Sequence, residues 1–256
     1  MQRHKISAFI PVHNVEDIIE ECLESIKWVD EIFIVDDFST DRTIEICKKY
    51  SNVKIVQHKY ENSGAQRYWG MPQVSNEWVL IIDSDERCTM ELRKEIEKIL
   101  SQNEIKFDGY EVHLKTKFLG KIQNHDRYLG HIGMRLVRKK SYKEYTLKRV
   151  HSTLDIKNHS RIRNKKAYII HIPIRDFRQH LQKIIRYAEW SAFDMFEKGE
   201  KAHWYNITIR PFFKFIKHYF IKLGFLDGIR GLILCIIASI TVFLKFYYLY
   251  ILNHQR

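Results

Sequence analysis

The stretch Trp78-Val-Leu-Ile-Ile-Asp-Ser-Asp-Glu-Arg87 decides how this chain is expected to fold. It begins with an apolar run without polar alternation, which is typical of a strand buried on both faces of a mostly parallel sheet. Asp83 and Asp85 follow where such a strand ends, and in an extended segment they would project to the same side. Open α/β sheets bind ligands at that edge. Two carboxylates beside Glu86 suit a divalent cation with a phosphorylated ligand, although an isolated Asp-x-Asp is more often a solvated acidic loop.

Predicted strands and helices alternate on both sides of this stretch. Residues 6–12, 31–35 and 53–56 have the pattern of short apolar strands. Asn14 is a residue type that caps helices, and Thr89 is expected to cap the helix after the quoted stretch. Strands alternating with helices predict βαβ units with right-handed crossovers. The predicted fold class is therefore α/β, with a mostly parallel, Rossmann-like sheet flanked by helices.

The pattern changes beyond residue 103. Shorter β-like segments at 110–117, 133–138 and 167–172 are joined by a strongly basic stretch, and no Gly/Ser-rich linker separates them from the first part. From residue 176 onward a helical pattern continues to the end of the chain. We predict a domain and a helical region with these bounds: 1–175 for the domain, 1–103 and 104–175 for its halves, and 176–256 for the helical region.

The composition indicates a folded protein with an anionic partner. The chain has 256 residues, 45% of them hydrophobic, which is enough for a packed core. Its net charge of +12 favours nucleic acid, an anionic membrane surface or a phosphorylated substrate as partner. Four scattered cysteines without a Cys-x-x-Cys pair argue against zinc and a disulfide framework. The N-terminus lacks the apolar region of a signal peptide, so we expect a protein of the cytosol or of its face of a membrane.

Residues 210–223 have the pattern of a basic amphipathic helix. The basic residues fall on one arc, and the Phe, Tyr, Ile and Leu residues fall on the opposite arc. Such a helix is typical of a membrane interface, although a helix packed on its own domain has a similar pattern. The basic residues are Arg210, Lys214, Lys217, His218 and Lys222.

The C-terminal residues are also apolar enough for a membrane. The uncharged segment 231–244 would be about 21 Å long as a helix, which is shorter than a hydrocarbon core of roughly 30 Å. Extension to Leu252 adds one charge, Lys245, and tyrosines that suit the headgroup level. We expect a membrane hairpin or monotopic anchor in preference to a full span, with residues 204–256 as the membrane-associating part.

Four polar motifs follow the predicted strands in order along the chain. They are Pro11-Val-His-Asn14, Asp36-Asp-Phe-Ser-Thr-Asp-Arg-Thr43, Gly64-Ala-Gln-Arg67 and Asp83-Ser-Asp-Glu86. Further motifs are Phe118-Leu-Gly-Lys121, Arg135-Leu-Val-Arg138 and Gly224-Phe-Leu-Asp-Gly228. The first set resembles a family 2 inverting glycosyltransferase with a GT-A fold. The second set resembles the subgroup that builds lipopolysaccharide core and related envelope sugars, whose typical member is a β-1,4-glucosyltransferase.

The resemblance implies a nucleotide-sugar site at the sheet edge, with a UDP-sugar as donor. A divalent cation, Mg²⁺ or Mn²⁺, would be held by Asp85, and Asp83 would contact the ribose or support the metal. Asp36 is similar to the family residue that binds the uracil-type base, with Asp37 beside it, although acids here also suit a helix N-terminus. The other implied contacts are Pro11 and His13 as pocket walls, Gly64 for close backbone approach, Ser84 between the acids, and Arg67 near the diphosphate.

Inversion also needs a base that removes the proton of the acceptor hydroxyl. The related subgroup commonly has a Glu after a Val-His pair in the acceptor half, residues 104–175 here. The corresponding residue is Ser152, which cannot be that base. Asp155 and His151 are therefore the candidate catalytic residues, and Asp126 is a further candidate.

The resemblance thus predicts a metal-dependent, inverting hexosyltransferase on the cytoplasmic face of the inner membrane, attached peripherally, monotopically or by a single span. Its acceptor would be an anionic envelope glycan or lipid-linked sugar, with Arg135 and Arg138 as candidate contacts. Nucleic acid is disfavoured as partner, because the basic residues fit no readout motif. The alternatives are a catalytically weakened nucleotide-binding scaffold of the same fold, or a nucleotidyltransferase, which the missing Gly-rich, Lys-bearing phosphate loop disfavours.

Overall fold

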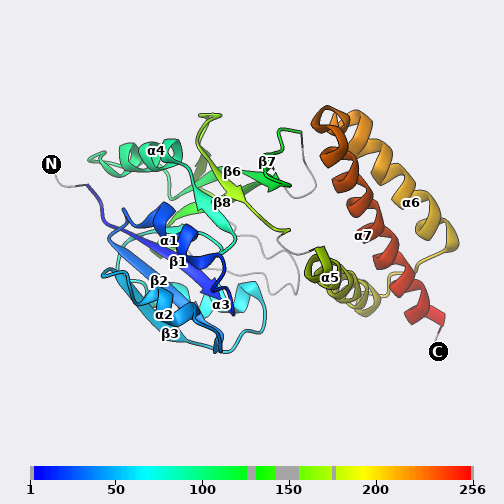
Figure 1. The fold of residues 1–256 in the computed structure, drawn as a ribbon, viewed down its shortest axis with the longest axis horizontal. Coiled ribbons are helices and arrows are strands. Elements are labelled where there is room, and N and C mark those ends of the chain that lie inside the picture. Colours follow the sequence, from blue (N-terminus) through cyan, green and yellow to red (C-terminus); the bar gives the residue numbers. More distant parts are fainter. Residues whose placement is uncertain (1–2, 126–130, 142–155, 175–176, 255–256) are drawn as a thin grey trace. The chain divides into compact units, whose positions relative to one another are not determined.

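The computed structural model describes most of the chain, namely residues 3–125, 131–141, 156–174 and 177–254. The chain divides into two compact units, each built from two segments (Figure 1). Unit 1 comprises Met1–Leu114 and Ile132–His171, and unit 2 comprises Lys115–His131 and Ile172–Arg256. A sheet forms the centre of unit 1, whereas unit 2 is mainly helical.

A mixed β-sheet is the frame of unit 1. Its strands are β1 (Ile6–Val12), β2 (Glu31–Asp36), β3 (Val53–Gln57), β4 (Trp78–Ile81), β5 (Glu86–Cys88), β6 (Gly109–Phe118), β8 (Ile132–Arg138), β9 (His159–Arg161) and β10 (Tyr168–His171). The order is β3-β2-β1-β4-β8-β6-β10-β5, with β9 beside β6. The first four strands are parallel, whereas β8 is antiparallel to β4 and β6. The predicted α/β fold is confirmed.

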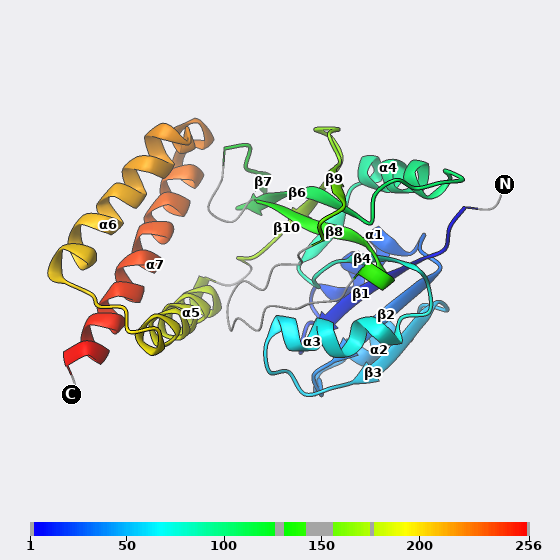
Figure 2. The same cartoon turned by 180° about the vertical axis from the view of Figure 1, so that it is seen from behind.

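Helices cover both faces of this sheet. α1 (Ile19–Ile26) and α4 (Met90–Leu100) bury their apolar stripes in one hydrophobic cluster with alternate side chains of β1. α3 (Ser63–Gly70) lies on the other face, where the end of the helix meets Phe9 of β1 (Figures 1 and 2). The short helix α2 (Thr43–Cys47) follows β2.

β4 is buried on both faces, as its apolar run predicts. Trp78 and Leu80 belong to one hydrophobic cluster, and Val79 and Ile81 belong to the other. Its neighbours are β1 on one side and β8 on the other. The acidic residues that follow β4 therefore lie beside the central strands of the sheet and not beside an edge strand.

The acidic residues after β4 do not form the expected extended segment, because Asp83 to Glu86 make a turn. The Glu86 N–H donates to the Asp83 carbonyl oxygen (2.9 Å), and the buried Glu86 carboxylate accepts the Asp83 N–H (2.9 Å). These bonds satisfy the backbone where the sheet ladder ends. After the turn, β5 pairs antiparallel with β10, which places His171 opposite Glu86.

Two helix starts test the predicted caps. Thr89 caps α4 as predicted, because its hydroxyl accepts the Leu92 N–H (3.3 Å). The expectation that Asn14 caps a helix is wrong, since α1 begins only at Ile19. Asn14 has a left-handed backbone (φ 48°), and its Oδ1 accepts the Thr40 N–H (2.8 Å). Asn14 thus joins the loop after β1 to the loop after β2.

Unit 2 is mainly helical between residues 177 and 254, as predicted. Its helices are α5 (Phe177–Glu197), α6 (Trp204–Ile216) and α7 (Gly228–His254), and β7 (Lys121–Ile122) pairs with the end of β6. α6 and α7 lie side by side (Figures 1 and 2), and Ser239 Oγ of α7 donates to the Pro211 carbonyl oxygen of α6. Asp227, before α7, accepts the N–H groups of Asn124 (3.2 Å) and His125 (3.0 Å). This carboxylate ties two distant segments of unit 2 together.

Candidate functional site

The predicted donor-site residues gather at one edge of the unit 1 sheet. β1, β2 and β4 are neighbouring parallel strands, so the residues at their carboxyl ends lie at the same edge. Pro11 is half-buried in β1, beside Val35 of β2. The other predicted residues follow these strands or lie in α3, and they are His13, Asp36, Asp37, Gly64, Arg67, Asp83, Ser84 and Asp85.

Asp36 is a buried residue that holds the loop after β2. Its side chain is fully buried, and its carboxylate accepts the Ser39 N–H (3.1 and 3.2 Å to its two oxygens). Gln57 Nε2, at the end of β3, donates to Asp36 Oδ2 (3.1 Å). These bonds fix the loop and turn the Asp36 carboxylate toward the protein.

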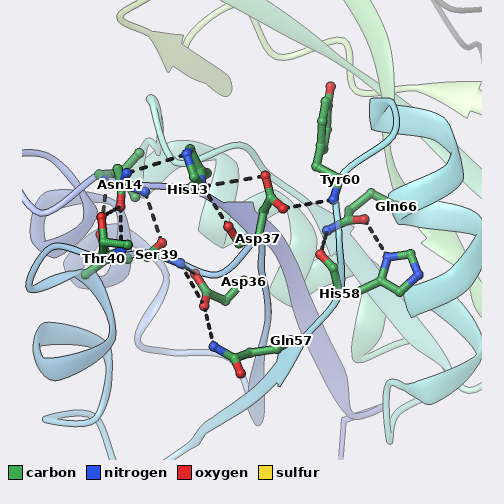
Figure 3. Close-up of polar contacts among 12 residues, drawn as sticks. His13, Asn14, Asp36, Asp37, Ser39, Thr40, Gln57, His58, Tyr60 and Gln66 are labelled. Atoms are coloured by element: carbon green, nitrogen blue, oxygen red, sulfur yellow. Dashed lines mark hydrogen bonds and ion pairs between the residues drawn. The ribbon is translucent and has the colours of Figure 1, made fainter.

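Asp37 is more accessible and lies beside His13. His13 Nδ1 is 2.7 Å from the Asp37 carbonyl oxygen and 3.5 Å from Asp37 Oδ2, and Asp37 Oδ1 accepts the Tyr60 N–H (2.9 Å). Figure 3 shows Asp37 between His13 and Tyr60, with the Tyr60 ring pointing away from the hydrogen-bonded pair His58 and Gln66. The side chains of His13 and Asp37 are 56% and 25% exposed. His13 and Asp37 are therefore open to a ligand, whereas the side chain of Asp36 is not.

α3 brings a positive charge to the acids that follow β4. Asn62 caps the helix, because its Oδ1 accepts the N–H groups of Gly64 (3.0 Å) and Ala65 (2.9 Å). One turn later, Arg67 Nη2 donates to Asp83 Oδ1 (3.2 Å). The Gly64 N–H is thus used at the helix start, while Arg67 reaches the centre of the site.

Asp83 lies between two arginines. Besides the bond from Arg67, its Oδ2 lies 3.7 Å from Arg135 Nη1. Burial raises the pKa of Asp83, but the charges of Arg67, Arg135 and His171 outweigh burial and lower that pKa to about 2. Asp83 is therefore ionised at neutral pH and is locked in position by its partners.

Glu86 is the buried acid of the group. Arg135 Nη2 donates to Glu86 Oε1 (2.6 Å), and Oε2 accepts the Asp83 N–H, so both carboxylate oxygens are engaged. Burial raises the pKa of Glu86, while the charge of Arg135 opposes that shift. Arg87 donates to the Ser84 carbonyl oxygen (2.8 Å), which holds the turn from its other side.

Among the residues that the structure describes, Asp85 and His171 fit a metal ion in this site. Asp85, Glu86 and His171 offer ligand atoms that all lie within 4.8 Å of one another. His171 Nε2 is 3.6 Å from Asp85 Oδ2, and both Glu86 oxygens have partners. A carboxylate with an imidazole suits Mn²⁺ better than Mg²⁺, which prefers oxygen ligands.

The acids around His171 favour a positive charge at this position. Burial lowers the pKa of His171, but its hydrogen bond to Asp85 and the charges of Asp85, Glu86 and Asp83 outweigh burial and raise that pKa. His171 Nδ1 is buried and has no hydrogen-bond partner among the residues that the structure describes. A cation beside Asp85 would take the place of the proton on Nε2.

The basic residues of β8 are not free to bind a separate anion. Arg135 is 7% exposed and pairs with Glu86 and Asp83, so it supports the acidic turn. Arg138 lies over the Trp78 ring at 5.0 Å and pairs with Asp108 at 3.4 Å. The expectation that these two arginines contact the acceptor is therefore wrong.

The candidate bases Asp155 and His151, with Asp126 and Ser152, lie outside the described residues, so their roles stay predictions. The sequence reasoning missed His171 as a member of the site. Its strand was predicted at 167–172, but the pairing of β10 with β5 was not. No local sequence pattern indicates that pairing.

Comparisons with known proteins identify the family of this chain. The model of glycosyl transferase family 2 matches residues 7–187. An uncharacterized glycosyltransferase of Rickettsia typhi is 28% identical over 94% of this chain and 85% of its own length. The lipopolysaccharide core biosynthesis glycosyltransferase LpsC of Rhizobium meliloti is 23% identical over 93% of this chain and 89% of its own.

The fold is also that of a solved glycosyltransferase structure. S. aureus TarS 1–349 in complex with UDP-GlcNAc has a TM-score of 0.55 and 17% identity, covering 98% of this chain and 92% of that one. This likeness shows a GT-A fold. Since the family model matches well over half of the residues, the chain belongs to glycosyl transferase family 2.

Proposed function

We propose that this protein is a metal-dependent, inverting glycosyltransferase that transfers one sugar from a UDP-sugar to an envelope glycan or lipid-linked acceptor. The observation that carries the proposal is the turn at Asp83 to Glu86, where acids, two arginines and a histidine converge in a family 2 fold. This edge of an open α/β sheet is where such folds bind ligands.

The donor would extend from the end of β2 to the turn after β4. TarS binds UDP-GlcNAc, which supports a uridine diphosphate donor here. The accessible Asp37 would accept a hydrogen bond from the base, and His13 and Pro11 would form walls beside it. Asp83 would accept a ribose hydroxyl, and Arg67 would lie near the diphosphate. Asp36 would contribute indirectly, because its carboxylate fixes the loop that carries Asp37.

Asp85 and His171 would hold a divalent cation. When bound, it would supply Lewis-acid stabilisation of the negative charge that develops on the departing diphosphate. The chain's own contribution is orientation, because Arg135 and Glu86 fix the turn that carries Asp85. Inversion requires a base on the acceptor side, and Asp155 and His151 are the proposed candidates.

The acceptor and the membrane complete the proposal. LpsC, named for lipopolysaccharide core biosynthesis, supports an anionic envelope glycan or lipid-linked sugar as acceptor, with residues 104–175 as the acceptor half. Among the described residues, the helical stretch Gly224–His254 is long and apolar enough to cross a membrane, with a mean hydropathy of 2.2. We propose that residues 204–256 attach the protein to the cytoplasmic face of the inner membrane, as an interfacial hairpin.

The test is release of UDP from UDP-sugars by the full-length protein with Mn²⁺. We expect turnover that EDTA abolishes, and Asp85→Asn should lower it about a thousandfold, since Lewis-acid stabilisation contributes several kcal/mol. Asp41→Asn is the matched control, because Asp41 accepts the loop N–H groups of Glu16 and Thr43 and has no part in the proposed cation site. Full activity of Asp85→Asn would exclude the metal-dependent mechanism. Donor binding without turnover would indicate a scaffold, and released pyrophosphate would indicate a nucleotidyltransferase.

A further inference from the structure

Two cations from different helices of unit 2 share one aromatic ring. The guanidinium carbon of Arg210 in α6 lies 4.6 Å from the centroid of the Phe246 ring, and Lys245 Nζ of α7 lies 4.7 Å from it. The Phe246 side chain is buried between the helices of unit 2 and is fixed by their packing. Its π-system stabilises both cations. The α6–α7 hairpin therefore holds two positive charges close together.

A third positive charge lies next to this pair. Lys214 follows Arg210 by one helical turn and is half-buried. Burial, followed by the charges of Lys217 and Lys245, lowers the pKa of Lys214, so these groups repel one another. Glu200 is the acid whose charge acts on Lys245. Convergent cations are unfavourable by themselves, and a bound anion would relieve their repulsion.

The helices that carry these cations also expose large apolar side chains. Ile209, Phe212 and Phe213 of α6 are 44%, 60% and 62% exposed, and Phe243 and Tyr247 of α7 are 41% and 42% exposed. Soluble proteins rarely expose so many large apolar side chains without a partner. A helix pair that carries both positive charges and exposed aromatic residues matches the boundary between phosphate headgroups and acyl chains. A soluble anion would neutralise the cations but would leave the aromatic residues in water.

We propose that Arg210, Lys214 and Lys245 form a binding site for the phosphate groups of anionic phospholipids, while the exposed aromatic residues of α6 and α7 enter the acyl region. This inference rests on the membrane attachment proposed above and names the lipid class that it selects. Lys245 supports it, since it is the one charged residue between Gly231 and Leu252 and lies where it meets Arg210. Long cationic side chains reach headgroups from apolar helices in this way.

The test is cosedimentation of the full-length protein with phosphatidylcholine vesicles that contain or lack phosphatidylglycerol. We expect tighter binding to the phosphatidylglycerol vesicles. Arg210→Gln with Lys245→Gln should weaken that binding about fivefold for each cation removed. The charge-conserving pair Arg210→Lys with Lys245→Arg should bind like the wild type. Phe212→Ser with Phe213→Ser should weaken binding to both kinds of vesicle.

A matched control removes the same charge elsewhere. Lys94→Gln with Lys98→Gln changes two exposed lysines of α4 in unit 1 and should keep wild-type vesicle binding. Equal binding of the wild type to both kinds of vesicle would overturn the inference. So would a control variant whose affinity for the phosphatidylglycerol vesicles falls as much as that of the variant with Arg210→Gln and Lys245→Gln. A stable dimer that binds no vesicles would instead assign the apolar surface to a second copy, and would also overturn it. UDP release measured without vesicles reports on the transferase separately, so the two proposals can fail independently.

Discussion

Two acidic pairs mark the sheet edge of unit 1, and their surroundings differ. After β2, the Asp36 carboxylate is bound by neutral donors, the Ser39 N–H and the Gln57 amide. After β4, Asp83 is bound by the guanidinium groups of Arg67 and Arg135. The first pair lies among neutral hydrogen-bond donors, whereas the second belongs to a network of opposite charges.

This difference indicates what each end of the site can bind. An accessible acid among neutral groups, such as Asp37, offers directional acceptors for a neutral base. The charged network after β4 offers Arg67 for a diphosphate and Asp85 with His171 for a cation, while Arg135 is the internal counter-ion of the acidic turn. Similar Asp-containing motifs in the sequence thus serve different chemistry, and variants at both pairs can separate their roles.

The largest effect is expected from Arg135→Met. Arg135 is buried, so its removal leaves the buried Glu86 without its cation and leaves Asp83 with Arg67 alone. Breaking such a pair costs about 3–5 kcal/mol of unfolding free energy, which urea denaturation would measure. Replacing both partners, Arg135→Met with Glu86→Leu, should restore part of the stability because less uncompensated charge is left.

The matched control lies beside the β2 pair. Arg42 forms an exposed ion pair with Glu16 at 3.3 Å, and its side chain is 73% exposed. Arg42→Met should therefore cost less than about 1 kcal/mol. Equal losses for the two arginine variants would contradict the distinction between a charged network after β4 and a neutral one after β2.

A smaller effect is expected on cation binding. Asp85→Asn and His171→Gln each remove one of the two ligands that fit a metal, and each should weaken Mn²⁺ binding about a hundredfold or more. Isothermal titration with Mn²⁺ in the presence of UDP measures this directly. Asp37→Asn, at the other acidic pair, should leave Mn²⁺ affinity unchanged. If all three variants bind Mn²⁺ like the wild type, the cation site is not at Asp85 and His171.

Much of the fold was predictable because local patterns determine it. Uninterrupted apolar runs such as Trp78–Ile81 signal strands buried on both faces, and the structure places their side chains alternately in two hydrophobic clusters. The grouping of residues 115–131 with the C-terminal helices was not predictable. It depends on Asp227 binding backbone groups about a hundred residues away, and no local pattern reports such a contact.

The candidate site was predictable only in part, for a related reason. Motifs after parallel strands indicate the sheet edge, so Asp37, Asp83 and Asp85 could be found from the sequence. His171 arrives through antiparallel pairing between β10 and β5, and strand pairing across the chain cannot be read from residue types. Arg135 looked like part of a basic surface, yet its burial against Glu86 makes it an internal counter-ion.

Donor binding should separate the two acids after β2. Asp37→Asn should weaken UDP binding about tenfold, the order of magnitude of one hydrogen bond to a charged group, with little change in melting temperature. Asp36→Ala should instead lower the free energy of unfolding by about 2 kcal/mol, because it removes the buried carboxylate that accepts the Ser39 N–H and the Gln57 amide. Isothermal titration and thermal unfolding measure the two effects. If Asp36→Ala instead weakens UDP binding and Asp37→Asn lowers the stability, Asp36 is the group that faces the ligand.

The smallest effect concerns the pH dependence of stability at Asp83. Its two arginine partners outweigh burial and lower its pKa to about 2, so the carboxylate stabilises the fold above the unfolded pKa of about 3.9. This contribution is lost as the pH falls through the folded pKa. The stability difference between the wild type and Asp83→Asn, measured by urea denaturation, should therefore shrink between about pH 4 and about pH 2. The side chain is 36% exposed, so solvent screening keeps the difference below about 1 kcal/mol. A difference that stays constant down to the lowest pH would show that the arginines do not hold Asp83 as a charged partner, and the contrast with the pair after β2 would then be lost.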